Sequence, residues 1–173
     1  MPKQLILFRH GKSDWDANFN HDHERPLAKR GKKAARLMGQ VLTAANQRPD
    51  RVITSTAVRA RTTAEIAQAA GDWPCPLQVT DELYEASLEQ VLRVIQGTVP
   101  AVETLLLVGH QPTWSASAAA FIGGGDLAVP TAAMVCITFD IDTWPAARWG
   151  GGSLKWLLPP KFFRQGFALP QED

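Results

Sequence analysis

The chain has 173 residues, a length typical of one domain with a self-supporting hydrophobic core. Hydrophobic residues make up 45% and charged residues 20%, and the Gly and Pro residues are scattered, which excludes a disordered, collagen-like or coiled-coil chain. Eighteen Lys and Arg against seventeen Asp and Glu leave a formal net charge of +1. No overall charge therefore attracts nucleic acid or a membrane surface, so we expect neither as a partner and any anion site must be local.

Two cysteines, Cys75 and Cys136, lie in no CxxC motif and have no histidine at metal-ligand spacing. We expect them to be buried free thiols in a reducing compartment. The apolar run at residues 5–8 is too short for a signal peptide, and no stretch reaches the roughly 18 apolar residues of a membrane span. These features predict a cytoplasmic protein.

Short apolar runs alternate along the chain with segments of helical periodicity. In chain order we expect a strand at Leu5–Phe8, a helix at Lys29–Asn46, a strand at Arg51–Thr54, a helix at Val58–Ala70, a strand at Leu77–Thr80, a helix at Ser87–Gln96, a strand at Thr104–Val108, a helix at Thr113–Ile122, and strands at Met134–Phe139 and Ser153–Leu158. This alternation predicts a three-layer α/β/α sandwich with a mostly parallel central sheet. We expect a single domain over residues 1–173.

Three of the predicted strands end where polar and cationic residues begin. Arg9, His10 and Gly11 follow the first strand, Arg59 comes shortly after the second, and His110 follows the fourth. If these strands are parallel neighbours, two imidazoles and two guanidinium groups meet at one edge of the sheet, where α/β proteins bind ligands. The sequence therefore predicts a phosphate-binding site there.

Each of these residue types suits one part of a phosphoryl-transfer reaction. Arg9 and Arg59 offer planar guanidinium groups that hold phosphate oxygens bidentately without a metal. His10 is a nucleophile near pH 7 if a carbonyl group fixes its tautomer. Gly11 leaves room for phosphate beside the backbone. His110, protonated when phosphate is bound, would stabilise the charge of the transferring group.

These motifs resemble a known family. RHG at residues 9–11, STAVRARTTAE at 55–65 and LLLVGHQP at 105–112 are similar, in order and spacing, to the histidine phosphatase superfamily, which includes cofactor-dependent phosphoglycerate mutases and acid phosphatases. RHGKSDW at 9–15, ERPLAKRG at 24–31, LYEAS at 83–87 and LKWLLPPKFFR at 154–164 are most similar to SixA-type phosphohistidine phosphatases. The resemblance covers nearly the whole chain.

The resemblance implies a phosphoglycerate mutase-like fold and a role for each matching residue. His10 is implied as the nucleophile that accepts the phosphoryl group. Arg9 and Arg59 are implied as phosphate clamps, and His110 as the second active-site histidine. Arg25, in the RPL motif, is implied as a further phosphate or substrate contact.

The chain departs from the mutases in two places. Asp16 stands where mutases carry Asn, and we assign it no phosphate role because a carboxylate would repel phosphate. Glu82 and Glu85 lie in the interval that holds the proton donor of mutases and acid phosphatases, but without the glycine that follows it in mutases. Both are candidate general acids. A phosphohistidine substrate needs less proton donation than a phosphate ester, because its P–N bond breaks with less assistance.

The connecting segments are short. Residues 12–28 form one charged loop, and residues 71–104 hold only a strand, a helix and turns, so no lid is expected over the site. An open, shallow pocket suits a phosphorylated side chain on a protein surface better than a metabolite that must be sequestered.

Some of these residues also have simple structural explanations. We expect Arg61 to be a surface charge, because it falls on a different helix face from Arg59. The alternative role of Arg25 is a salt bridge within its own loop, to Asp22 or Glu24.

The run His21–Glu24 has residue types that bind metals, but a solvated loop is the favoured interpretation because no rigid third ligand is evident. Ser55 and Thr56 are expected to cap the following helix. Trp15 and Trp114 are both expected to pack in the core or at the rim of the site, and Trp15 is the better candidate for touching substrate.

These inferences predict a metal-independent, cofactor-free phosphatase that forms a phosphohistidine intermediate on His10. The expected substrate is a phosphohistidine on a protein. The alternatives are a general phosphomonoesterase for small phosphorylated substrates and, from another class, a catalytically silent module that binds a phosphorylated ligand. A mutase is less favoured, because it would need a lid and a clear general acid.

Overall fold

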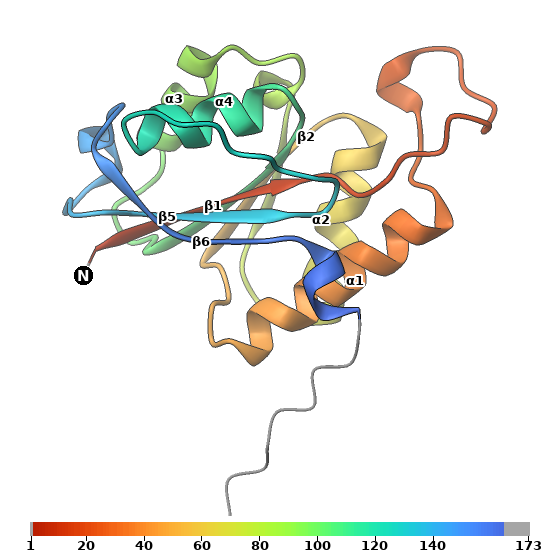
Figure 1. Ribbon diagram of the computed structural model, residues 1–173, viewed down its shortest axis with the longest axis horizontal. Coiled ribbons are helices and arrows are strands. Elements are labelled where there is room, and N and C mark those ends of the chain that lie inside the picture. The colour runs from red at the N-terminus through yellow and green to blue at the C-terminus, as the bar shows by residue number, and fades with distance from the viewer. Residues whose placement is uncertain (1, 165–173) are drawn as a thin grey trace, which may run out of the picture.

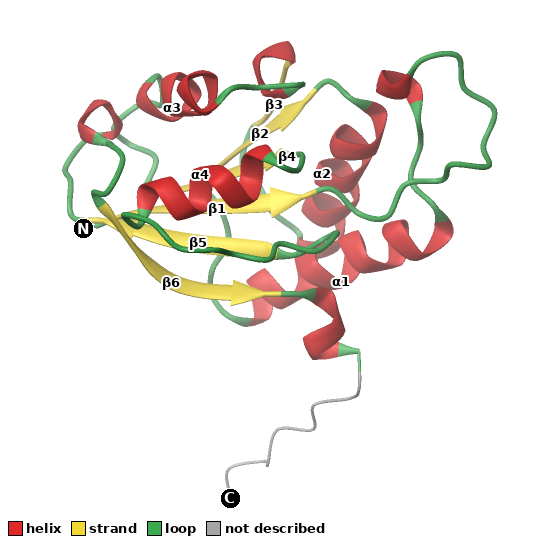
Figure 2. Cartoon of the chain, turned by 45° about the horizontal axis from the view of Figure 1, so that its top comes forward, coloured by secondary structure: helices red, strands yellow, loops and turns green. Residues whose placement is uncertain are grey.

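The computed structural model describes residues 2–164, which form one six-stranded sheet in the order β3-β2-β4-β1-β5-β6 (Figure 2). The strands are β1 (Lys3–Arg9), β2 (Arg51–Ser55), β3 (Leu77–Thr80), β4 (Thr104–Gly109), β5 (Met134–Phe139) and β6 (Gly152–Leu158). Strands β1 to β4 are mutually parallel, whereas β5 runs antiparallel to both β1 and β6. The predicted mostly parallel sheet is confirmed.

Four helices cover the two faces of the sheet (Figure 1). They are α1 (Lys29–Ala44), α2 (Val58–Gly71), α3 (Leu88–Gln96) and α4 (Thr113–Phe121). In Figure 1, α1 and α2 lie on one face, and α3 and α4 lie on the other, which confirms the predicted three layers. Four short 3₁₀ helices also occur: η1 (Asp22–Glu24), η2 (Asp81–Leu83), η3 (Trp144–Ala146) and η4 (Pro160–Phe163).

The hydrophobic core is divided by the sheet into two layers. Along β1, Leu5 and Leu7 point to the layer that includes α3 and α4, whereas Ile6 and Phe8 point to the layer beneath α1 and α2. All four are fully buried. A strand buried on both faces needs a continuous apolar run, which is why this sequence contains one.

Two predictions need correction or restriction. Cys75 and Cys136 are both free, but only Cys136 is buried and Cys75 is partly exposed, beside the end of the sheet near β3. The predicted domain of residues 1–173 includes residue 1 and residues 165–173, which lie outside the described residues. Within the described part, no helix is long and apolar enough to cross a membrane.

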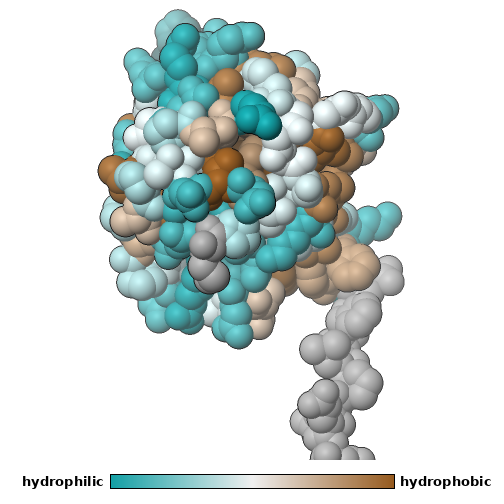
Figure 3. Space-filling view, turned by 90° about the vertical axis from the view of Figure 1, so that its left-hand side faces the viewer, coloured by the Kyte–Doolittle hydropathy of each residue, from teal (hydrophilic) through white to brown (hydrophobic). Residues whose placement is uncertain are grey.

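The two ends of the sheet differ in character. The end that contains the amino terminus of β1 shows hydrophobic side chains scattered among polar ones (Figure 3). At the other end the parallel strands β1, β2 and β4 finish together, and the loop of residues 12–28 extends from it (Figure 1). The predicted site residues lie at this second end.

Candidate active site

The structure brings together the two predicted histidines and all three predicted arginines. Arg9, His10, Arg25, Arg59 and His110 all line one cavity of about 210 Å³, which we call the catalytic pocket. The imidazole rings of His10 and His110 lie 5.2 Å apart, centroid to centroid. Parallel pairing of β1 with β4 and of β4 with β2 produces this convergence, because each residue follows the end of its strand.

His10 is held in one tautomer by the backbone. Its Nδ1 donates a hydrogen bond of 2.7 Å to the carbonyl oxygen of Gly11, so the lone pair lies on Nε2. Burial and the positive charges of Arg59 and Arg9 lower the pKa of His10 to about 4, although the bond to Gly11 opposes this change. The imidazole is therefore neutral at pH 7, as a nucleophile requires.

The loop that carries His10 is fixed by close backbone contacts. The N–H of Gly11 donates to Thr63 Oγ1 (3.0 Å), and that hydroxyl donates to the carbonyl oxygen of Arg59 (2.7 Å). A Cβ atom at Gly31 would lie only 2.2 Å from the carbonyl oxygen of Lys12. Gly31 therefore allows α1 to pack directly against the loop, and Thr63 joins the loop to α2.

Three buried nitrogen atoms in the catalytic pocket residues have no hydrogen-bond partner. They are Arg9 Nε, Arg59 Nε and His110 Nδ1. Arg9 uses only Nη1, which donates to the carbonyl oxygen of Val129 at 2.9 Å. The catalytic pocket thus gathers three guanidinium groups and two imidazoles, a set of side chains that suits a bound anion.

His110 is anchored by a residue whose role the sequence did not reveal. Its Nε2 lies 2.9 Å from Ser55 Oγ, which also accepts a hydrogen bond from the Ala57 N–H. Burial, with the neighbouring charges of His10 and Arg59, lowers the pKa of His110 to about 3. The expectation that Ser55 and Thr56 cap α2 is wrong, because the N-cap is Ala57.

Asp22 is the main site residue that sequence reasoning missed. Its carboxylate accepts hydrogen bonds from Arg25 Nη2 (2.8 Å), Arg59 Nη2 (3.0 Å) and the Tyr84 hydroxyl (3.1 Å). Partial burial alone would raise the pKa of Asp22, but Arg25, Arg59 and Tyr84 together lower it to about 2. This internal anion thus pairs with two of the arginines that the sequence predicts for phosphate, Arg25 and Arg59.

Arg25 forms one of its two predicted contacts, and its role toward phosphate stays a prediction. It forms the predicted ion pair with Asp22 in its own loop, and it lies buried in the wall of the catalytic pocket. Its guanidinium also donates to Ser13 Oγ and stacks 3.7 Å from the ring centroid of Trp15. Trp15 is 65% exposed at the rim, whereas Trp114 is fully buried.

The run His21–Glu24 contributes to the site through hydrogen bonds. His23 Nε2 lies 2.8 Å from Thr56 Oγ1, and its ring packs edge-on against Tyr84. In the part of the chain that the structure describes, no group of three or more His, Cys, Asp or Glu residues is placed to hold a metal ion.

The two candidate general acids lie in different places. Glu82 lines a separate cavity with Arg51 and Arg93, so the structure does not bring it to the histidines. Glu85 lines a cavity of about 390 Å³ together with Arg59 and His110.

Two other charged residues singled out in the sequence, Arg61 and Asp16, lie away from the catalytic pocket. Arg61 pairs with Glu65 on the surface of α2, as expected for a surface charge. Asp16 is exposed and does not line the catalytic pocket.

Comparisons with known proteins agree with this geometry. The family model described as "Histidine phosphatase superfamily (branch 1)" matches residues 5–92. An uncharacterized protein of Mycobacterium tuberculosis is 42% identical over 123 residues, which are 70% of this chain and 75% of that protein. The structure of the protein histidine phosphatase SixA complexed with tungstate is similar, with a TM-score of 0.80, 26% identity, and coverage of 92% of this chain and 98% of that one.

The fold and the pocket of histidines and arginines, with these relatives, define the chain as a phosphatase. It belongs to the histidine phosphatase superfamily, branch 1. An enzyme is therefore favoured over the catalytically silent binding module.

Proposed function

We propose that this phosphatase needs no metal, forms a phosphohistidine intermediate on His10, and removes phosphate from phosphohistidine on a protein. The observation that carries the proposal is the convergence of Arg9, Arg59 and His110 on the pocket that holds the neutral His10. Fixed guanidinium N–H donors stabilise the equatorial oxygens of a transferring phosphoryl group.

In the first step, the lone pair of His10 Nε2 attacks phosphorus and an N–P bond forms while the N–P bond of the substrate breaks. The substrate leaves as neutral imidazole from its protonated phosphohistidine form. His10 keeps the proton on Nδ1, which donates to the Gly11 carbonyl, so its phosphorylated ring carries a positive charge.

In the second step, water attacks phosphorus and the bond to His10 Nε2 breaks. Both protons of the water leave with the product, dihydrogen phosphate, and His10 returns to its neutral form. The cationic ring makes this bond labile, because the nitrogen departs as a neutral imidazole.

His110 changes its protonation state during this cycle. It is neutral at pH 7, because burial and nearby cations keep its pKa at about 3. An incoming phosphate places negative charge beside the ring and displaces Asp22 from Arg59, and the phosphate charge favours the imidazolium form. We infer that His110 takes up a proton on Nδ1 and donates it in a hydrogen bond to a phosphate oxygen.

Two observations support a protein substrate. Trp15 lies exposed at the rim of the catalytic pocket, next to Arg25, where a bound protein surface would reach it. The structurally similar SixA is described as a protein histidine phosphatase. We also propose a single domain and, because both cysteines are free thiols, a cytoplasmic location.

A second candidate function is the hydrolysis of small phosphate esters. The observation that favours it is Glu85, whose position in a cavity with Arg59 and His110 would let a carboxyl group donate a proton to an alkoxide leaving group. In that case Glu85→Gln would lower kcat on esters.

The deciding experiment compares turnover of a histidine-phosphorylated protein with turnover of sugar phosphates and phosphoglycerates, all in EDTA. We expect kcat/KM to be highest for the phosphohistidine protein and insensitive to EDTA. Hydrolysis of small esters at a higher kcat/KM would reject the protein substrate, and loss of all activity in EDTA would reject the metal-free mechanism.

A further inference from the structure

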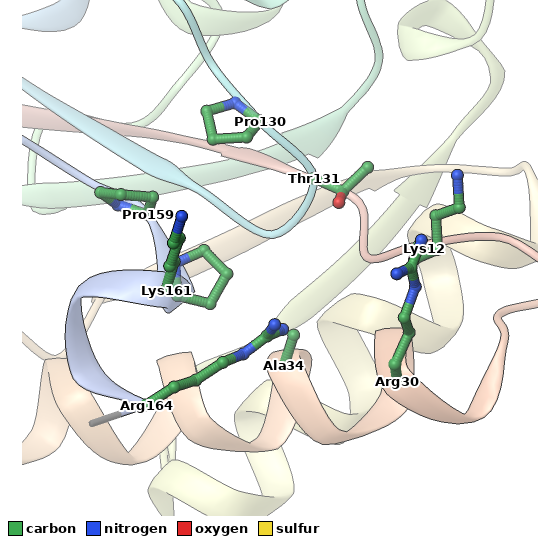
Figure 4. Close-up of a pocket in the computed structure, with 9 residues that line it drawn as sticks. Lys12, Arg30, Ala34, Pro130, Thr131, Pro159, Lys161 and Arg164 are labelled. Atoms are coloured by element: carbon green, nitrogen blue, oxygen red, sulfur yellow. The ribbon is translucent and has the colours of Figure 1, made fainter. Parts of the chain in front are cut away.

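A second cavity, which we call the basic cleft, adjoins the catalytic pocket (Figure 4). It has a volume of about 330 Å³, and its charged lining residues are all cations: Lys12, Arg30, Lys161 and Arg164. Figure 4 shows that they reach the cleft from three separate segments: the loop after β1, the first turn of α1, and η4 with the residue after it. The remaining lining residues are Ala34, Pro130, Thr131, Pro159 and Pro160.

No carboxylate neutralises these four cations within residues 2–164. The ion pairs in this part of the chain belong to Lys3, Arg25, Arg59 and Arg61. Gathering like charges raises the electrostatic energy of the folded protein, and the whole chain has a net charge of only +1. The uncompensated cluster therefore indicates an anionic ligand.

The basic cleft lies next to the catalytic pocket, because Lys12 and Thr131 line both cavities. Next to Thr131, the N–H of Ala132 donates to the carbonyl oxygens of Arg9 (3.1 Å) and His10 (3.0 Å). An anion in the cleft would thus lie beside a phosphoryl group on His10, and one substrate would occupy both.

The walls of the cleft are rigid and supply few hydrogen-bond donors other than the cations. Pro130, Pro159 and Pro160 have fixed φ angles and no backbone N–H. The first turn of α1 contains no acidic residue, and its N-cap, Ala28, makes no side-chain hydrogen bond. The positive end of the helix dipole therefore adds to the field of Arg30.

We propose that the basic cleft binds acidic side chains that flank the phosphorylated residue of a protein substrate, an inference that rests on the proposed function. Arg30, Lys161 and Arg164 are exposed, whereas a small ligand is normally enclosed on most sides. Among the residues of the range 2–164 that line the cleft, none has an aromatic side chain to pack on a base or sugar ring, and Thr131 has the one hydroxyl. Exposed cations of this kind attract carboxylates on a protein surface and orient the encounter.

The test uses two phosphohistidine peptides that differ only in their flanks, which carry Asp in one and Asn in the other. The variant Lys161→Glu/Arg164→Glu reverses two charges of the cleft outside the catalytic pocket. The matched control is Lys32→Glu/Lys33→Glu, which also reverses two positive charges. Lys32 and Lys33 are exposed on α1 and line neither cavity.

At low salt we expect wild type to hydrolyse the acidic peptide with about ten-fold higher kcat/KM than the neutral one, and to lose most of this preference at high salt. The cleft variant should lose the preference and keep its p-nitrophenyl phosphate turnover within two-fold, while the control keeps both. No preference in wild type, or a preference that the cleft variant retains, would overturn the inference.

Fluorescence anisotropy of the unphosphorylated, labelled acidic peptide separates this inference from the proposed function. Wild type should bind it about ten-fold more tightly than the cleft variant does, whether or not phosphohistidine is hydrolysed. If binding differs in this way but neither phosphopeptide is turned over, the proposed function fails and the cleft assignment stands. A preference for small bisphosphates that depends on Lys161 and Arg164, without any peptide preference, would reassign the cleft to a metabolite.

Discussion

Removal of the Asp22 charge should tighten the binding of inorganic phosphate. The Asp22 carboxylate accepts hydrogen bonds from Arg25, Arg59 and Tyr84, so phosphate must displace it to reach the same guanidinium groups. Asp22→Asn keeps the size of the side chain but removes the competing negative charge. The variant therefore measures how strongly this internal anion opposes the ligand.

The magnitude follows from the pKa of Asp22. That pKa is about 2, against an ordinary value of 3.8. At about 1.4 kcal/mol for each pKa unit, the difference corresponds to about 2.5 kcal/mol. The Asp22 side chain is 48% exposed, however, and solvent screening reduces this to about 1 kcal/mol. We therefore expect the Kd for phosphate to fall about five-fold in Asp22→Asn.

Isothermal titration calorimetry with inorganic phosphate at pH 7 and fixed ionic strength measures this change. Glu24→Gln is the control, because Glu24 lies in the same 3₁₀ turn and, within the described residues, its carboxylate forms no ion pair with Arg25 or Arg59. Its Kd should stay within two-fold of wild type. An Asp22→Asn protein that is folded but binds phosphate with equal or weaker affinity would show that Asp22 is no competitor.

The other predictions concern the histidines and the close-packed glycines. Burial holds the pKa of His10 at about 4 and that of His110 at about 3, below the ordinary value of 6.5. Between pH 6.5 and 4 the unfolded chain therefore binds more protons than the folded protein does. The free energy of unfolding should fall as the pH drops through this range. Urea unfolding at a series of pH values measures this change. The free energy of unfolding should fall less steeply with pH in the variant that carries Asn in place of both His10 and His110. The same pH dependence in wild type and variant would reject the assigned pKa values. Phosphate binding near pH 6.5 should be accompanied by proton uptake at His110. Calorimetric titration in buffers of different ionisation enthalpy measures the number of protons taken up, and a value of zero would show that His110 stays neutral. Gly31→Ala and Gly39→Ala each place a Cβ 2.2 Å from a carbonyl oxygen and should each destabilise by about 1–3 kcal/mol in thermal unfolding. Gly31→Ala should also lower kcat, because the added Cβ displaces the loop at Lys12, whereas Gly39→Ala should not. An equal loss of kcat in the folded Gly39→Ala protein would contradict this explanation.

Most of the fold could be predicted from the sequence because its elements have strong local signals. The fully apolar run at Leu5–Phe8 predicts a strand covered on both faces, and β1 is such a strand. The convergence of His10, Arg59 and His110 also followed from sequence, since each lies just after a parallel strand. Periodicity predicted α1 but placed its end at Asn46, two residues beyond Ala44.

The partners of the site residues could not be predicted in the same way. Asp22 reaches Arg59 through the path of a 17-residue loop, residues 12–28, and no periodic pattern specifies that path. The positions of Glu82 and Glu85 differ because Glu82 lies within the 3₁₀ helix η2, whereas Glu85 has a positive φ of 50°. Such tertiary and turn geometry leaves no signal in residue type alone.

The basic cleft also depends on contacts between distant segments. Lys12 and Arg164 are more than a hundred residues apart in the chain, and each has the sequence context of an ordinary surface charge. Lys12 and Arg164 line one cavity only because η4 and α1 pack beside the loop that follows β1.

The most direct test of the mechanism is to trap the phosphorylated enzyme and locate the phosphoryl group. Rapid quenching at alkaline pH during turnover, followed by peptide mapping and NMR of the phosphorus nucleus, identifies the modified atom. The geometry predicts an acid-labile phosphoryl group on His10 Nε2, since Nδ1 is bonded to the Gly11 carbonyl. A phosphoryl group on any other residue, or a His10→Ala protein that still forms the labile intermediate, would contradict the account.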